Sequence, residues 1–315
     1  MSTAPVYDLI PEHPTPGIVT VQELAPALEK MYDNGVTRGV HPGWDTLADY
    51  YLPQEGQVTF VGGTPSHGKT RFVSHMMLNI MTLHHWKFAA FSPESRPERF
   101  VKQLLEQYTG KCFDLVPDKW RSVQPRVERM TKEEMWSAQA WLHDHFSMIA
   151  PPHQSATIPG MLQLARRQVE YEGVKGIIFD PWSWVAKTPA RGQLLTHYVA
   201  EQLVNLKHFC TEFDCHLWLI AHPTKLRQAE KGPYAGLYAP PTLYDISDSA
   251  HFYNMADMGL CVWRNTDTND PETEIHIQKV KFEENGQTGK VKLFYDKYTK
   301  RYHDIGTEPV RTYEY

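Results

Sequence analysis

The sequence has no long apolar run and few cysteines, and each absence excludes a class of protein. None of its 315 residues belongs to a run of about 18 apolar residues, so we expect no membrane-spanning helix and no membrane partner. The N-terminal segment lacks a basic region followed by a hydrophobic one, which argues against secretion. The four cysteines form neither a Cys-x-x-Cys pair nor a disulfide framework. These features predict a soluble protein of a reducing cytoplasm, the host's if the chain is viral.

The chain also lacks a strong charge of either sign. Its net charge of −5 excludes a uniformly basic coat, so contacts with nucleic acid must come from local patches. Among its 16 histidines, the nearest clusters are His84-His85 and His143/His145, and none pairs with cysteine or carboxylate at metal-ligand spacing. We interpret these clusters as exposed polar residues on helices. With 41% apolar residues, the chain can bury one large core, alone or with a small appendage.

A proline-rich arm and one helix precede the main pattern. Residues 1–18 are rich in proline and predict an extended arm, and Leu24, Leu28 and Met31 have helical spacing within 21–32. We assign residues 1–40 as an N-terminal arm and linker helix. The helix either docks on another body, such as a neighbouring subunit, or packs on its own core.

From residue 56 onward, short apolar segments alternate with amphipathic ones. Thr131 with Glu134 forms a capping box, and Thr157 can cap the next helix. This alternation predicts an α/β fold with a central, mostly parallel sheet and a tail of antiparallel strands. We expect strands at 58–62, 87–92, 176–180, 216–222, 258–263, 273–282, 290–295 and 300–303, and helices near 69–84, 96–108, 131–145, 157–171 and 193–213.

Residues 63–70 match the motif G-x-x-x-x-G-K-[ST], which holds nucleotide phosphates. They lie between a predicted strand and a predicted helix, which is the context that the motif requires. Glycines let backbone N–H groups face phosphate oxygens, while the lysine reaches the β- and γ-phosphates and the threonine hydroxyl holds Mg²⁺. The sequence therefore predicts binding of ATP, or another nucleoside triphosphate, with Mg²⁺ by Gly63, Thr64, Pro65, Ser66, His67, Gly68, Lys69 and Thr70.

Three other predicted strands end in polar residues, at the sheet edge where such folds bind ligands. Asp180 can bind Mg²⁺, or it is a turn aspartate before proline. Glu94 can activate the attacking water, or it belongs to the first turn of a helix. His222 can bond the γ-phosphate and report its loss, or it is structural.

Taken in order, these motifs resemble the ATPase domain of ring-forming DnaB-type replicative helicases, particularly the phage and Twinkle-like branch. The similarity runs from Gly43-Trp44 to about residue 305 and includes 91–94, 221–223, 245–257 and 260–264. It implies a RecA-like domain over 41–315, a hexameric ring, single-stranded DNA in its centre and ATP sites shared between subunits. It also implies that Glu94 is the catalytic base, that Asp180 is the Walker B aspartate and that Tyr295 contacts the base, unless Tyr295 is a core aromatic.

One position departs from the family. The family carries Lys-x-Arg-Phe where this chain has Lys279-Val-Lys281-Phe282, and that arginine reaches the neighbouring subunit's γ-phosphate. Lysine supplies charge without the planar fork of arginine. Either Lys281 acts as the finger, or Arg264 substitutes for it, or turnover is slow, or Lys281 is simply exposed on an edge strand.

A long segment with basic and aromatic residues interleaved follows His222. In the family this segment lines the ring's channel, so Lys225, Arg227 and Lys231 are expected to bind DNA phosphates, with 187–191 as a second candidate. A solvated loop without DNA is the alternative.

The leading hypothesis is an ATP-driven DNA helicase that translocates on single-stranded DNA during replication. A RecA/RadA-like recombination or loading ATPase is the first alternative, and a nucleotide-switched DNA-binding protein with weak hydrolysis is the second. Because residues 1–40 contain no primase domain or zinc ribbon, we expect a separate primase and a separate DNA polymerase.

Overall fold

The computed structural model describes residues 17–114, 128–152, 156–224, 226, 228–246, 249–268 and 270–306. These residues build a nine-stranded sheet in the order β3-β2-β4-β5-β1-β6-β7-β8-β9. Neighbours from β3 to β6 are parallel, and the remaining pairs are antiparallel. The strands are β1 (Val58–Gly62), β2 (Lys87–Phe91), β3 (Phe146–Met148), β4 (Val174–Phe179), β5 (His216–Ile220), β6 (Met258–Trp263), β7 (Glu272–Val280), β8 (Gly289–Asp296) and β9 (Arg301–Asp304). The predicted sheet is therefore confirmed.

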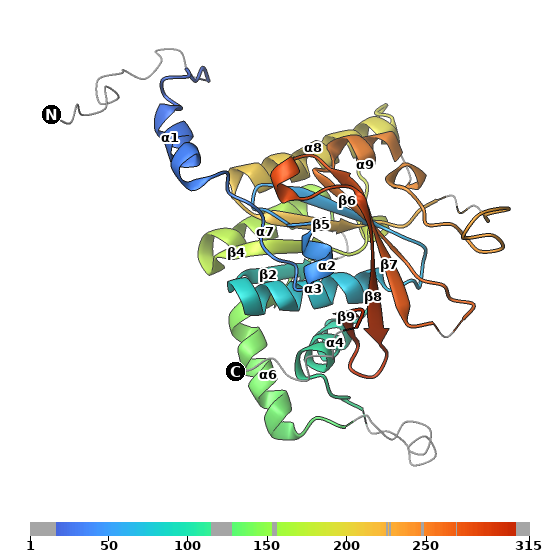
Figure 1. The fold of residues 1–315 in the computed structure, drawn as a ribbon. Coiled ribbons are helices and arrows are strands. Elements are labelled where there is room, and N and C mark those ends of the chain that lie inside the picture. The colour runs from blue at the N-terminus through green and yellow to red at the C-terminus, as the bar shows by residue number, and fades with distance from the viewer. Residues whose placement is uncertain are drawn as a thin grey trace.

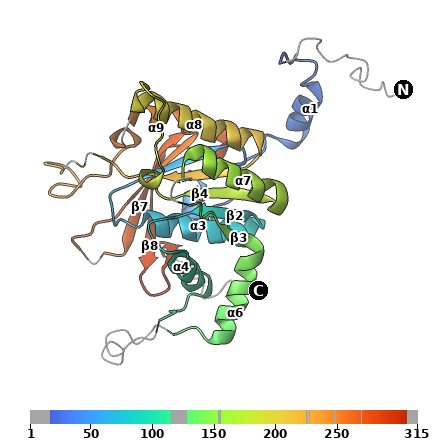
Figure 2. The same cartoon turned by 180° about the vertical axis from the view of Figure 1, so that it is seen from behind.

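Helices cover both faces of the sheet (Figures 1 and 2). One face packs against α3 (Lys69–His84), α4 (Pro97–Thr109) and α6 (Lys132–His145), and the other against α7 (Ile158–Glu172), α8 (Leu195–Glu212) and α9 (Ser249–Met255). Along β5, Leu217 and Leu219 join one core and Trp218 joins the other. Since both faces are buried, the central strands are almost wholly apolar.

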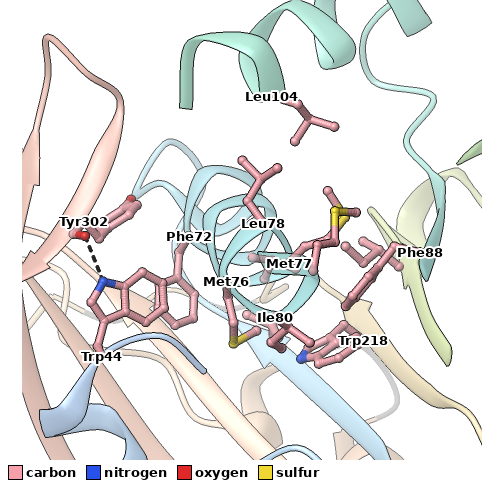
Figure 3. Packing of buried hydrophobic residues seen from close by; sticks show 14 of the residues in the cluster. Trp44, Phe72, Met76, Met77, Leu78, Ile80, Phe88, Leu104, Trp218 and Tyr302 are labelled. Carbon is pink, nitrogen blue, oxygen red and sulfur yellow. Dashed lines mark hydrogen bonds between the residues drawn. The ribbon is translucent and has the colours of Figure 1, made fainter. Parts of the chain in front are cut away.

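Helix α3 is held by contacts from both ends of the domain. Trp44, just before the short helix α2 (Asp45–Ala48), stacks on Phe72 of α3 with ring centres 5.4 Å apart. Its indole N–H donates to the carbonyl of Tyr302 on β9 at 2.8 Å (Figure 3). Met76, Met77 and Ile80 of the same helix are buried. These contacts fix the helix whose first turn follows the glycine-rich loop.

Most predicted elements are confirmed, and the differences have local reasons. The limits of β1, α3 and β6 are as predicted, and Thr131 and Thr157 cap α6 and α7. Strands β2, β4 and β5 stop one or two residues before the predicted polar ends. Among the α-helices and strands of the described residues, three short ones were not predicted, because none is long enough to show a period: α2, β3 and α9.

Helix α1 (Ala25–Asn34) begins later than predicted and has no buried residue. It stands away from the body of the domain (Figure 1), and Leu24, Leu28 and Met31 are exposed. Of the two alternatives for this helix, packing on its own core is therefore not seen in the described residues. In the described residues, no helix is both long and apolar enough to cross a bilayer.

A chain of hydrogen bonds crosses the core between β1 and β5. The Trp218 indole N–H donates to the Tyr51 hydroxyl at 2.8 Å, and that hydroxyl bonds Thr59 Oγ1 at 2.8 Å. Thr59 bonds His216 Nε2 at 2.8 Å, while His216 Nδ1 faces the Gln54 carbonyl at 2.6 Å. Burial lowers the pKa of His216 to about 4, so its ring is neutral. Because the Gln54 carbonyl only accepts, Nδ1 of His216 carries the proton and Nε2 accepts from the Thr59 hydroxyl. Thr59 in turn accepts from the Tyr51 hydroxyl.

Replacing Tyr51 with phenylalanine removes the central group of this chain. The Trp218 N–H then loses its acceptor and the Thr59 hydroxyl loses its donor. We therefore expect the free energy of unfolding to fall by about 1–3 kcal/mol. Chemical denaturation measures the change. Tyr50→Phe is the matched control, because Tyr50 does not belong to this series of hydrogen bonds. A loss below about 0.3 kcal/mol would contradict the argument.

Candidate nucleotide site

The glycine-rich loop joins β1 to α3 in a conformation that requires glycine at two positions. Gly63 has φ 142° and Gly68 has φ 96°. A Cβ on Gly63 would lie 2.3 Å from the Val262 carbonyl oxygen, and one on Gly68 would lie 2.7 Å from the Tyr302 hydroxyl. The loop is therefore held tightly between α3, β6 and β9, with the N-terminus of α3 at its end.

Lys69 is buried at the start of α3 and turned back onto the loop. Its ammonium donates to the carbonyls of Gly63 and Thr64 at 2.6 and 3.0 Å. Burial lowers the pKa of Lys69 to about 8, while the nearby carboxylates of Asp180 and Glu94 act in the opposite direction. Among the described residues, the buried Thr64 hydroxyl has no hydrogen-bond partner. The loop thus offers a cation and a free polar group at one place, which fits a phosphate ligand.

Two oxygen ligands lie together beside this lysine. Asp180 directly follows β4, is 2% exposed and is hydrogen-bonded by the Thr70 side chain. Burial raises the pKa of Asp180 to about 6, and the Thr70 hydrogen bond opposes that shift. A carboxylate and a hydroxyl are the hard oxygen ligands that Mg²⁺ takes. The pair fits the predicted magnesium site.

Glu94 and His222 face each other across the end of the sheet. His222 Nε2 lies 3.4 Å from Glu94 Oε1, although β4 separates their strands. Burial and the charge of Lys69 lower the pKa of His222, so the ring is neutral near pH 7. Its Nε2–H then donates to Glu94, and its buried Nδ1 has no hydrogen-bond partner among the described residues. The sequence predicted both residues at this edge but not their contact.

A cavity of about 370 Å³ joins these groups. Ser66, Gly68, Lys69 and Thr70 line it from the loop side, and Glu94, His222 and Tyr295 line it from the ends of other strands. The structure therefore brings most of the predicted nucleotide and catalytic residues together. Tyr295 lines this cavity, as a base-contacting residue would, but it is only 5% exposed and also belongs to the hydrophobic core.

Arginines flank Tyr295 in this cavity. The Arg71 guanidinium donates to the Tyr295 hydroxyl at 2.9 Å, and the guanidinium carbons of Arg71 and Arg264 each lie 5.8 Å from the ring centre. Arg71, Gln103 and Tyr302 also line the cavity and were not predicted. Arg71 could have been found, because it follows the loop motif directly in the first turn of α3.

Lys281 lies at the opposite end of the strands from the nucleotide loop, near the amino end of β1. Its ammonium is 3.6 Å from Asp257 Oδ1, and the Asp257 carboxylate accepts from the backbone N–H of Val58 at 3.2 Å. Val58 begins β1, whereas the glycine-rich loop follows its other end, roughly 13 Å further along the strand. Lys281 therefore lies about one strand length away from this chain's own glycine-rich loop. Arg264, the alternative finger residue, lines the nucleotide cavity of the same chain.

The predicted DNA-binding residues lie in or before a hairpin. Lys225 and Arg227 fall outside the described residues. Residues 228–238 are bridged from Gln228 to Tyr238. We call them the basic hairpin because Lys225 and Arg227 directly precede them in the sequence; within the hairpin, Glu230 offsets the charge of the exposed Lys231. Thr224 N–H donates to the Asp245 carbonyl at 2.9 Å, so the segment that begins at His222 returns to its starting point.

Replacing Gly63 with alanine tests the loop geometry. The added methyl would meet the Val262 backbone, so we expect the loop to shift and nucleotide affinity to fall by about tenfold or more. Gly56→Ala is the matched control, because Gly56 also has a positive φ of 79° but open space around its Cβ position. Equilibrium binding of a fluorescent ATP analogue measures the effect. Equal affinities for the two variants would contradict the packing argument.

Comparisons with known proteins identify a family and a relative of similar sequence. The family model of the DnaB-like helicase C-terminal domain matches residues 39–304. The chain is 33% identical over 303 residues to the Arabidopsis thaliana "Twinkle homolog protein, chloroplastic/mitochondrial", covering 94% of this chain but 41% of that longer protein.

Two solved structures share the fold. One is an ATPase domain that superposes with a TM-score of 0.70 at 17% identity, over 90% of this chain and 98% of that one. The other, a DnaB-like replicative helicase studied with its primase interactions, gives 0.67 at 15% identity, over 91% and 67%. These likenesses confirm the expected RecA-like fold. The sequence match and the site together place the chain: it belongs to the DnaB-like helicase C-terminal domain family.

Proposed function

We propose that this chain is the ATP-driven motor of a ring-forming DNA helicase that translocates on single-stranded DNA during replication. The observation that carries the proposal is the meeting of Lys69, Glu94 and His222 at one cavity, directly before the segment that leads to the basic hairpin. A site for hydrolysis and a candidate DNA contact are thus joined by a few residues. Membership of the helicase family supports the same reading.

The residues of the cavity divide the chemistry among them. Lys69 and the loop N–H groups would hold the β- and γ-phosphates, while Thr70 and Asp180 would hold Mg²⁺. When bound, Mg²⁺–ATP supplies the phosphoryl group whose transfer to water drives the cycle. Glu94 accepts the proton of the attacking water. Neutral His222 donates its Nε2–H either to Glu94 or to a phosphate oxygen, and the exchange between them reports the nucleotide state to the segment that follows.

The position of Lys281 supports a site shared between subunits. It lies about one strand length from its own loop, is half-exposed and lies near Asp257, which Lys207 also bonds. In a ring, the Lys281 edge of one subunit can reach the nucleotide cavity of the next, where its charge neutralises the γ-phosphate. The exposed apolar side chains along α1 support the same assembly, because docking on a neighbouring copy would bury them. We propose a homo-hexamer.

Partners follow from the same model. Lys231, together with Lys225 and Arg227 of the same segment, would grip successive phosphates of single-stranded DNA. Primase and DNA polymerase are further proposed partners. The lysine at position 281 favours one alternative, a nucleotide-switched DNA-binding protein with slow hydrolysis, since lysine lacks the bidentate geometry of arginine.

Replacing Glu94 with glutamine removes the proposed base and keeps the side-chain shape. We expect ATP turnover to fall by about 100-fold or more, with nucleotide affinity changed less than about threefold. The control is Glu98→Gln, which alters an exposed glutamate in the first turn of α4. Steady-state turnover and equilibrium nucleotide binding measure the two quantities. Turnover within twofold of the unaltered chain would contradict the role of Glu94.

Replacing Lys281 tests the shared site. We expect Lys281→Ala to lower turnover by about tenfold or more in the assembled ring, and Lys281→Arg to retain or exceed the original rate. Lys175→Ala is the matched control, because Lys175 lies at the same edge of the sheet and is 49% exposed, against 47% for Lys281. Turnover that is equal in Lys281→Ala and Lys175→Ala would exclude Lys281 as the finger.

A further inference from the structure

Trp263, the last residue of β6, lies between the glycine-rich loop and the basic hairpin. Its ring centre is 6.2 Å from that of His67 in the loop and 4.8 Å from that of Tyr234 in the hairpin, and both contacts are edge-on. Its indole N–H donates to the Tyr238 carbonyl at 2.8 Å. The side chain is 6% exposed. One buried indole therefore contacts the nucleotide loop on one side and two tyrosines of the hairpin on the other.

The loop is attached to the end of β6 at two further points. His67 Nδ1 accepts from the backbone N–H of Arg264 at 3.1 Å. Burial, with the charges of Lys69 and Arg264, lowers the pKa of His67 to about 4, so Nδ1 stays free to accept. Gly63 is packed so closely against the Val262 carbonyl that a methyl group has no room there. A movement of the loop is therefore passed to residues 262–264.

The hairpin is held as a unit and is anchored to the sheet. The Ala229 N–H donates to the Leu237 carbonyl at 2.9 Å, and the Gln228 side chain donates to the Gly236 carbonyl at 2.7 Å. The Tyr234 hydroxyl donates to Glu274 Oε2 at 2.6 Å. A shift of its tyrosines would thus carry the whole hairpin, Lys231 included.

Space for such a shift lies next to these contacts. A cavity of about 200 Å³ is bounded by His67 and Trp263 on the loop side and by Gln228, Gly236 and Tyr238 on the hairpin side. Protein interiors are close-packed, so a void between two segments lets one move without compressing the other.

We propose that Trp263 is a positioning residue that couples the nucleotide bound at the loop to the basic hairpin, and through it to affinity for single-stranded DNA. The inference rests on the proposed helicase function. It gives the hairpin a second connection to the nucleotide. His222 is joined to the hairpin through the chain, whereas Trp263 contacts its Tyr234 and Tyr238 directly. A coupling residue must change the two affinities reciprocally.

The test uses Trp263→Phe in the full chain, which keeps an aromatic ring and removes the N–H that bonds Tyr238. The protein is titrated into a fluorescein-labelled oligothymidine, once with Mg²⁺–ADP present and once with a non-hydrolysable ATP analogue present. The ratio of the two dissociation constants for DNA measures the coupling. In Trp263→Phe, we expect this ratio to lie about fivefold or more closer to unity than in the unaltered chain. Its nucleotide affinity in the absence of DNA should stay within about twofold of that of the unaltered chain. Trp136→Phe, an exposed tryptophan on α6, is the matched control.

Each outcome decides between the proposals. A ratio unchanged in Trp263→Phe, or a loss of nucleotide affinity without DNA, overturns the coupling role and leaves the proposed function standing. A unit ratio in the unaltered chain contradicts the helicase function itself. Should Trp263→Phe not fold, Tyr234→Phe removes only the hydroxyl that bonds Glu274 and must also lower the ratio. An unchanged ratio there would overturn the inference.

Discussion

The packing of α3 against the sheet is the constraint on which the site depends. Trp44 and Tyr302 come from opposite ends of the domain and meet beside Phe72, so the helix cannot rotate or slide without breaking both contacts. Its first turn supplies Lys69 and Thr70, and its N-terminus provides backbone N–H groups and a positive dipole end. Placing this helix therefore places the phosphate site.

The charges at the site balance one another within a small buried space. Lys69 is almost fully buried, yet Asp180 and Glu94 lie close enough to act on its pKa. Burial, together with the charge of the same lysine, depresses the pKa of His222, which keeps that ring neutral and able to donate a single N–H. Because these charges act on the pKa values of Lys69, Asp180 and His222 in addition to burial, a phosphate ligand at the site would alter them together. This mutual dependence is what a nucleotide-driven switch requires.

Local sequence signals were enough to predict the elements that form the site. The glycine-rich motif specified its own strand and helix, and the capping box at Thr131 marked the start of α6. The polar ends of β2, β4 and β5 predicted which side chains meet at the carboxyl edge.

What the sequence did not predict depends on register between distant segments. The contact of Glu94 with His222 requires β2, β4 and β5 to be adjacent and aligned. Trp263 reads as one more apolar strand residue until β6 lies next to both the loop and the hairpin. Strand β3 directly follows the helical pattern of α6, with no breaker between them. Such contacts arise from tertiary structure, which local patterns do not encode.

The central claim is that hydrolysis at this cavity is coupled to movement on DNA. Its most direct test measures ATP turnover, with and without single-stranded DNA, alongside unwinding of a forked duplex by the same preparation. The account predicts that single-stranded DNA raises turnover and that the fork is unwound only when ATP is hydrolysed. Turnover that DNA leaves unchanged, with no strand separation, would contradict it.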